Sequence, residues 1–428
     1  MSYFNFALAA ALAICLSAQP LRANPLDQAE AMVRANQPAQ ALATLAQVRE
    51  TAGNQARLLW IRAAAHLQRR EFRAALPLLE RLVTAMPGEE RFRLELGRAL
   101  YETGQDDRAR HHLTLARAGG VSPGEDRVIA SYFNAMTRRQ VTTGNFSFAI
   151  APSANPGKRT DAEVIFIAGL PFTLTPEARA QPGTALRFGV GVVHRPTLGR
   201  DLRARLSFSA NAEAYDTGAD SSAILTGEAG LEWLGDRDRV FGVGLTIGRK
   251  IDQGTGDYTR AGGYFSYVAT VGASSAVLAR FELVRQHNHN RPRADGNRAR
   301  FFAQYRHAAS PQLQWRASFE AERLSAKAVD ETFDRLSVGL GASYGFAGGL
   351  SLGVDVTQDM VRYDGLSPLF GVQRRDDITT IGARLFHREF QVGGFAPVLN
   401  LTHEVGKSSS ALHTYDNTTV SIGLTREF

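Results

Sequence analysis

From residue 141 onward, apolar and polar residues alternate one by one, and this period of two constrains the fold more than any other feature. In the stretch 202–215, one set of alternate positions is wholly apolar and the other carries Arg, Ser, Asn and Glu. The stretch 312–322 repeats the pattern, with Trp315 on the apolar side and Glu320 on the polar side. Successive side chains of a strand point to opposite faces. Each segment is therefore predicted to be a strand with one apolar and one charged face.

About fourteen such segments follow one another, and strands of this length and alternation suit a transmembrane barrel whose apolar face meets lipid. They begin near residues 141, 184, 202, 221, 239, 258, 275, 297, 312, 333, 350, 377, 396 and 417. Tight connections such as 308–311 alternate with longer polar links such as 286–296, 361–376 and 406–416. Short turns of such barrels face the periplasm, so both ends of the strand region are expected there. A soluble β-sandwich would alternate in the same way.

The last strand separates these two alternatives. Its apolar residues recur by twos up to a terminal Phe, although Arg426 interrupts the run. This is how an outer-membrane barrel ends, and the barrel-assembly machinery recognises such a strand. The residues predicted to form this assembly signal are Val420, Ile422, Leu424 and Phe428. We therefore predict an antiparallel barrel of roughly fourteen strands over residues 139–428, embedded in outer-membrane lipid.

The N-terminus predicts export. Residues 6–18 are an apolar run, too short to span a bilayer but long enough for the core of a signal peptide. Small residues follow, and we expect a signal peptide over residues 1–23. Cys15 is the only cysteine, and the preceding Ile14 argues against a lipidation signal. The mature chain would then lack disulfides and thiolate metal sites.

Residues 24–138 carry a helical repeat. Three alanines lie 34 residues apart, and each is followed four positions later by a leucine. The residues predicted to pack between helices are Ala41, Ala75, Ala109, Leu45, Leu79 and Leu113. A helix brings positions i and i+4 onto one face, and a period of 34 is that of the tetratricopeptide repeat. We predict an α-solenoid of this kind, which offers its concave surface to other proteins; an ordinary helical bundle is the alternative.

No segment predicts catalysis or a cofactor. His287 and His289 share a strand face but have no third ligand nearby, and the loop 252–257 lacks most ligands of a calcium site. We find no nucleophile elbow and no Walker loop. Lys and Arg number 49 against 42 Asp and Glu, a net charge of +7 without a dense basic block, which does not predict nucleic-acid binding. We predict no enzyme, no metal and no cofactor.

Three segments add a resemblance to a known family. They are Gly254-Thr255-Gly256-Asp257-Tyr258-Thr259-Arg260, the run Arg374-Arg375-Asp376-Asp377, and the ending from Gly394-Phe395-Ala396-Pro397 through Ser408-Ser409-Ser410 and Tyr415 to Phe428. Together with the two-part architecture, they resemble the surface lipoprotein assembly modulators, the Slam proteins. These proteins join a periplasmic tetratricopeptide domain to a fourteen-stranded outer-membrane barrel.

The resemblance implies a function and partners. The protein is expected to help specific cargo, either surface lipoproteins or small secreted ligand-binding proteins, to cross the outer membrane. The helical arm would hold the cargo in the periplasm, and the polar lumen would offer it a route outward. Two alternatives are a substrate-selective porin with a periplasmic scaffold domain, and an assembly scaffold that the barrel merely tethers.

Overall fold

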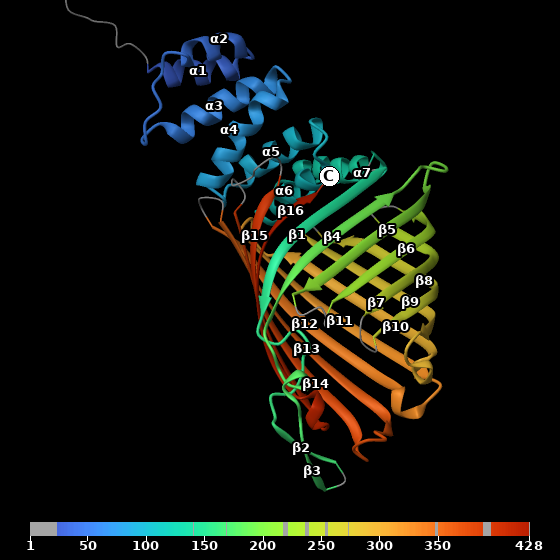
Figure 1. The fold of residues 1–428 in the computed structure, drawn as a ribbon. Coiled ribbons are helices and arrows are strands. Elements are labelled where there is room, and N and C mark those ends of the chain that lie inside the picture. The colour runs from blue at the N-terminus through green and yellow to red at the C-terminus, as the bar shows by residue number, and fades with distance from the viewer. Residues whose placement is uncertain are drawn as a thin grey trace, which may run out of the picture. The chain divides into compact units, whose positions relative to one another are not determined.

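The computed structural model describes residues 24–427 except 140, 168, 217–220, 236–238, 253–255, 273, 347–349 and 388–394. The expected signal segment and Phe428 therefore lie outside the described residues. The chain divides into two compact units, one up to Leu82 and one from Val83 onward. In the described part, seven α-helices come first and the strands follow (Figure 1).

The helices follow one another with short connections. They are α1 (Pro25–Arg34), α2 (Pro38–Leu45), α3 (Gln55–Gln68), α4 (Phe72–Ala85), α5 (Glu90–Glu102), α6 (Asp106–Ala118) and α7 (Pro123–Arg139). The first begins at a capped end, because the Asn24 side chain accepts a hydrogen bond from the N–H of Leu26 at 3.0 Å and Pro25 occupies the first turn.

The turns inside the helix pairs repeat one geometry. A residue with positive φ lies at Asn36, Arg70 and Gly104, again 34 residues apart. In each turn the next residue donates its N–H to the carbonyl five residues back, at 2.8, 2.9 and 2.9 Å. Asn and Gly adopt this left-handed conformation readily, whereas Arg70 does so at a cost. The period seen in the sequence is thus also a period of backbone geometry.

Fourteen of the strands form one closed barrel. They are β1 (Thr142–Ser153), β4 (Gly183–His194), β5 (Leu202–Tyr215), β6 (Ser222–Leu234), β7 (Val240–Asp252), β8 (Tyr258–Val271), β9 (Ser275–Asn288), β10 (Gly296–Ala308), β11 (Leu313–Ala326), β12 (Phe333–Gly345), β13 (Leu350–Leu366), β14 (Gln373–His387), β15 (Ala396–Ser408) and β16 (Tyr415–Glu427). Each is antiparallel to its neighbours, and β1 pairs with both β4 and β16. The prediction of about fourteen antiparallel strands is confirmed.

The seam between β1 and β16 is the joint that closes the ring. Its register runs from Asn145 opposite Glu427 to Ile150 opposite Ile422, and it resumes at Ser153 opposite Thr419. Pro152 lies in the interruption and has no N–H to donate. On its other side, β1 pairs with β4 without a break from Thr142 to Ser153.

The connections differ from the prediction in length. Strands β13 and β15 continue to Leu366 and Ser408, and β14 begins at Gln373, so the links after β13 and β15 are shorter than expected. Polar residues continue the strand pairing there, because backbone hydrogen bonds between strands form outside the lipid as well as within it. The loop end is the barrel end with these links, and the turn end is the end where β1 begins and β16 finishes.

The longest connection, 154–182, joins β1 to β4 at the loop end and holds two strands that we did not predict. Strands β2 (Val164–Ile167) and β3 (Leu170–Thr173) pair as a separate hairpin (Figure 1). Paired residues share a face, and both faces of this hairpin are apolar. Phe166 and Leu170, on opposite faces, are 66% and 63% exposed.

Four short 3₁₀ helices lie in loop-end connections. They are η1 (Pro176–Ala178), η2 (Pro292–Ala294), η3 (Val329–Glu331) and η4 (Ala411–His413). Ion pairs join η2 to η3, with Arg293 and Asp330 at 2.6 Å and Arg291 against Glu331. Lys327 also pairs with Asp295 at 2.8 Å. The hydrogen bond from Lys327 and a second from the N–H of Asn288 hold the pKa of Asp295 well below its usual value.

Candidate functional site

The outer face of the barrel is apolar. The alternation predicted from the sequence places bulky apolar side chains outward along the barrel strands. Exposed examples are Phe188, Leu206, Phe208, Leu245, Phe265, Leu283, Leu340, Val356 and Ile381. An apolar surface of this extent is unstable in water and matches the hydrocarbon of a bilayer. None of the described helices is long and apolar enough to cross a membrane.

The inner wall is charged, and its charges are paired. Arginines contact carboxylates around the wall, mostly on the adjacent strand, once on the same strand and once across two intervening strands. The pairs are Arg203–Glu232 at 2.6 Å, Arg280–Glu228 at 2.7 Å, Arg280–Glu282 at 3.2 Å, Arg298–Glu282 at 3.7 Å, Arg300–Glu320 at 2.6 Å, Arg335–Asp359 at 2.8 Å, and Arg298 with Glu322. We call this set the ladder. It satisfies charges that would otherwise be costly to bury.

Strand register explains which ladder groups meet. Arg203 lies directly opposite Glu232. Arg300 instead lies opposite Glu322 and reaches the diagonal Glu320 with two hydrogen bonds, at 2.8 and 2.6 Å. Diagonal neighbours in a sheet are within reach of long side chains.

Arg280 of β9 reaches Glu228 of β6 across β8 and β7, where the inner face presents the ring of Tyr264 and the bare backbone of Gly244. It lies 4.1 Å from the ring centroid of Tyr264 on β8. Tyr264 lies over Gly244 of β7, where an added Cβ would be 2.8 Å from the phenolic oxygen. The absence of a side chain at Gly244 therefore leaves room for the Tyr264 ring. Arg280 extends above this ring to Glu228 of β6.

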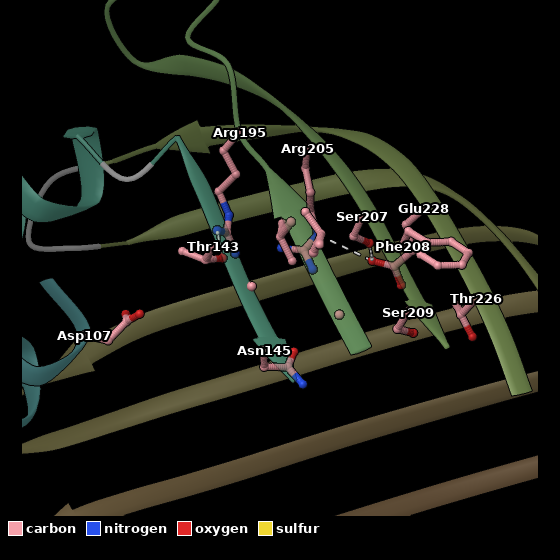
Figure 2. A pocket seen from close by; sticks show the side chains of 14 residues that line it. Asp107, Thr143, Asn145, Arg195, Arg205, Ser207, Phe208, Ser209, Thr226 and Glu228 are labelled. Atoms are coloured by element: carbon pink, nitrogen blue, oxygen red, sulfur yellow. Dashed lines mark hydrogen bonds and ion pairs between the residues drawn. The ribbon is translucent and has the colours of Figure 1, made fainter. Parts of the chain in front are cut away.

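A polar cavity of about 560 Å³ opens on this wall near the turn end (Figure 2). It is lined by residues of β1, β4, β5 and β6 and by Asp107 of α6. Its lining is Asp107, Thr143, Gly144, Asn145, Gly191, Val192, Val193, Arg195, Arg205, Ser207, Phe208, Ser209, Thr226 and Glu228. Gly191 contributes no side chain, and an added Cβ there would collide with the side-chain oxygen of Asn145, so glycine at this position keeps the space beside Asn145 open.

Two arginines of the cavity are held more loosely than those of the ladder. Arg195 donates to the Thr143 hydroxyl at 3.2 Å and lies 3.7 Å from Glu232. Arg205 lies 3.4 Å from both Glu228 and Glu232. Ser207 donates to Glu228 at 3.0 Å. A guanidinium carries five N–H donors, so both arginines keep donating capacity toward the cavity.

The residues predicted to pack between helices are all fully buried. Ala41, Leu45, Ala75, Leu79, Ala109 and Leu113 have no exposed surface. In the second unit, α5 and α6 approach closely at Gly97, where an added Cβ would lie 2.6 Å from Cγ of Leu113 and 3.4 Å from the carbonyl oxygen of Ala109. In the first unit, Ala41 and Leu45 belong to one core with Leu58 and Ile61.

The predicted assembly-signal residues face outward from β16. Val420, Ile422 and Leu424 are exposed, whereas the intervening Ser421 is buried. Phe428 lies outside the described residues. That Val420, Ile422, Leu424 and Phe428 direct assembly stays a prediction.

The sites that the sequence argued against can also be located. His287 lies 3.1 Å from Asp295, and His289 lies 2.9 Å from the Thr259 hydroxyl. Among the described residues, no group of three or more His, Cys, Asp or Glu is placed to hold a metal ion. In the loop 252–257, residues 253–255 lie outside the described part, and Asp257 pairs with Arg249.

Sequence reasoning missed the cavity and its arginines. Arg195 follows the last residue of β4 and belongs to no alternating run. Arg205 was placed correctly on the polar face of its strand, but alternation says nothing about its partners. Register between β4, β5 and β6 is needed to bring the two together.

The closed barrel, its apolar outer face and the helical repeats together define the class of this protein: an outer-membrane β-barrel with a periplasmic tetratricopeptide domain. The family model described as "Surface lipoprotein assembly modifier" matches residues 175–428, and one described as "Tetratricopeptide repeat" matches residues 66–119. The chain belongs to the surface lipoprotein assembly modifier family, as the sequence resemblance indicated.

A relative and two solved structures illustrate the similarity. A surface lipoprotein assembly modifier from Moraxella catarrhalis is 22% identical over 384 residues, covering 86% of this chain and 72% of the relative. The outer membrane channel DcaP of Acinetobacter baumannii is 9% identical, with a TM-score of 0.40, covering 67% of this chain and 96% of that one. Pseudomonas aeruginosa OccK1 is 11% identical, with a TM-score of 0.38, covering 67% and 99%.

Proposed function

We propose that this protein delivers specific exported proteins, above all surface lipoproteins, from the periplasm to the cell surface. The observation that carries the proposal is the match of the surface lipoprotein assembly modifier family over residues 175–428. Two features of the chain support it. The helical repeats belong to a class that binds other proteins on a concave face. The inner wall carries paired charges of both signs, which suit a polar polypeptide.

The repeats have a defined part in this proposal. They hold an incompletely folded cargo in the periplasm and present it to the turn end of the barrel. The domain boundary that we propose lies at residues 138 and 139, so the helical arm comprises residues 24–138. A plain porin has no need of such an arm, whereas a translocated protein does.

Gene deletion tests the function directly. Surface proteomics on the deletion strain should find one or a few lipoproteins stranded in the periplasm, while the uptake of small solutes is unchanged. Removal of residues 24–138 should give the same defect with the barrel still inserted. An unchanged surface proteome together with altered permeability to a small solute would instead support the selective porin.

The barrel-assembly machinery is the second partner that we propose for this protein. Val420, Ile422 and Leu424 present an apolar edge of the last strand, and Phe428 follows it. Changing Phe428 to Asp should strongly reduce insertion while transcript and secretion are unchanged. Wild-type amounts of heat-modifiable barrel in the outer membrane would show that the ending carries no such signal.

A further inference from the structure

The cavity near the turn end has the chemistry of a binding site. Its volume of about 560 Å³ falls within the range of about 300–1,000 Å³ usual for ligand sites. Its donors are the two guanidinium groups of Arg195 and Arg205 and the hydroxyls of Thr143, Ser209 and Thr226 (Figure 2). Several convergent donors around one space favour an oxyanion.

The two arginines hold more unused donating capacity than their neighbours. Arg203, two residues before Arg205 on the same face of β5, contacts Glu232 at 2.6 Å. Arg205 approaches the same carboxylate only to 3.4 Å. Nε of Arg195 is buried and makes no hydrogen bond within the described part of the chain, with Glu232 3.7 Å away. An incoming carboxylate would satisfy both guanidinium groups more closely than Glu232 does.

Two carboxylates in the same cavity favour a polypeptide carboxylate over a free phosphate as the bound anion. Glu228 and Asp107 line it together with the arginines. A free phosphate, with its concentrated charge and no N–H groups, would be repelled by these two carboxylates. An extended polypeptide offers backbone N–H donors to the carboxylates and an acidic side chain to the arginines.

We propose that this cavity binds a carboxylate-bearing, extended segment of a polypeptide, with the carboxylate between Arg195 and Arg205. The proposal rests on the proposed function in one respect, since it makes that segment part of the cargo. The cavity lies near the turn end of the barrel, so it is the place where an acidic segment meets the inner wall after leaving the periplasm. Acidic segments of cargo would thus be selected at this point.

The test uses the full chain in detergent micelles and a fluorescent peptide in which Ser and Asp alternate. The peptide should bind, and an otherwise identical peptide of Ser and Asn should bind at least about tenfold more weakly. Arg195→Gln and Arg205→Gln should each weaken binding about tenfold, the loss of one charge-assisted hydrogen bond. The matched control is Arg300→Gln, which removes a ladder arginine that Glu320 already satisfies; it should leave binding unchanged.

A further variant covers the case in which an arginine variant fails to assemble. Ser209→Glu supplies a carboxylate inside the cavity and removes no charge, so it should block the peptide while heat-modifiable migration shows an intact barrel. Equal binding of the neutral peptide would overturn the proposal, and so would an equal loss in Arg300→Gln. Complete displacement by inorganic phosphate would show a free-oxyanion site instead. These outcomes concern peptide binding alone, whereas failure of the proposed function would show as a normal surface proteome in the deletion strain.

Discussion

The helical domain and the barrel put the same residue types in opposite places. Leu45 and Leu79 of the helices are completely buried, whereas Leu245 and Leu340 of the barrel are 69% and 63% exposed. In the barrel wall, by contrast, a charged residue such as Glu322 is almost wholly buried. Burial of apolar side chains stabilises a protein only when its surroundings are water. The comparison therefore identifies the solvent of each region: water around the helices and lipid around the strands.

Arginine placed in the helical core should have the largest effect. Ala109→Arg forces a long charged side chain into the fully buried contact between α5 and α6, and we expect a loss of about 3–5 kcal/mol, as for other uncompensated buried charges. Limited proteolysis of the full chain would report local unfolding of the helices. His111→Arg, on the exposed side of the same helix, should resist protease like the wild type. Equal protection of both variants would show that the 34-residue phase does not place Ala109 at a tight contact.

Arginine on the lipid face should have the next largest effect. Leu340→Arg places a charge on the outer surface of β12, at a cost of about 2–4 kcal/mol near the middle of the bilayer. Ser337→Arg is the matched control, because Ser337 pairs in register with Glu320 and Asp359, two inner-wall carboxylates. Urea titration of the heat-modifiable folded band in lipid vesicles measures both. If Ser337→Arg were the more damaging, the assignment of inner and outer faces would be wrong.

A methyl group added under Tyr264 should have a smaller effect. An alanine Cβ at Gly244 would lie 2.5 Å from the carbonyl oxygen of Ala229 and 2.8 Å from the tyrosine hydroxyl. Such overpacking costs about 1–3 kcal/mol. Gly248→Ala, on the same strand and face, meets its nearest neighbour at 3.8 Å and should be neutral. The same urea titration compares them, and two equal midpoints would mean that Tyr264 moves aside freely.

The loop end should show the smallest effect, as a dependence on pH. Burial next to Arg374 lowers the pKa of His413 to about 4, and Nδ1 of His413 lies 2.9 Å from the Ser410 hydroxyl. An unfolded histidine titrates near pH 6.5. The folded loop therefore keeps its full stability above pH 6.5 and loses it as the pH falls toward 4, because the unfolded form binds the proton more tightly. Asp295, whose pKa is lowered, stays ionised throughout this window.

Hydrogen exchange of residues 408–415 would measure this dependence. The protection of these amides, measured against the intrinsic exchange rate at each pH, should fall on acidification across that window in the wild type, and His413→Leu should remove the dependence. Equal protection of the loop amides at both ends of the window would show that His413 is solvated. The result sharpens the comparison, because this loop buries a neutral histidine, whereas the wall buries pairs of opposite charges.

The sequence predicted the strands well because alternation is a local property. The starts of β5, β8 and β9 coincide with the predicted positions, since each residue reports its own face. The hairpin of β2 and β3 escaped, because each strand has four residues and both faces are apolar, so there is no alternation to read. The cavity escaped for another reason: Arg195 directly follows β4 and Arg205 lies on β5, and only the register between those two strands places the arginines together.

The pairing of β1 with β16 means that the barrel can close only after the whole chain has been synthesised and exported. β1 is the first barrel strand to be made and β16 the last, so one edge of β1 must wait while every other strand is synthesised and exported. An unpaired strand edge readily joins other chains. The helices preceding β1 are complete long before the ring can close, so the water-soluble part of the molecule matures first and its membrane part must be kept from premature pairing in the meantime.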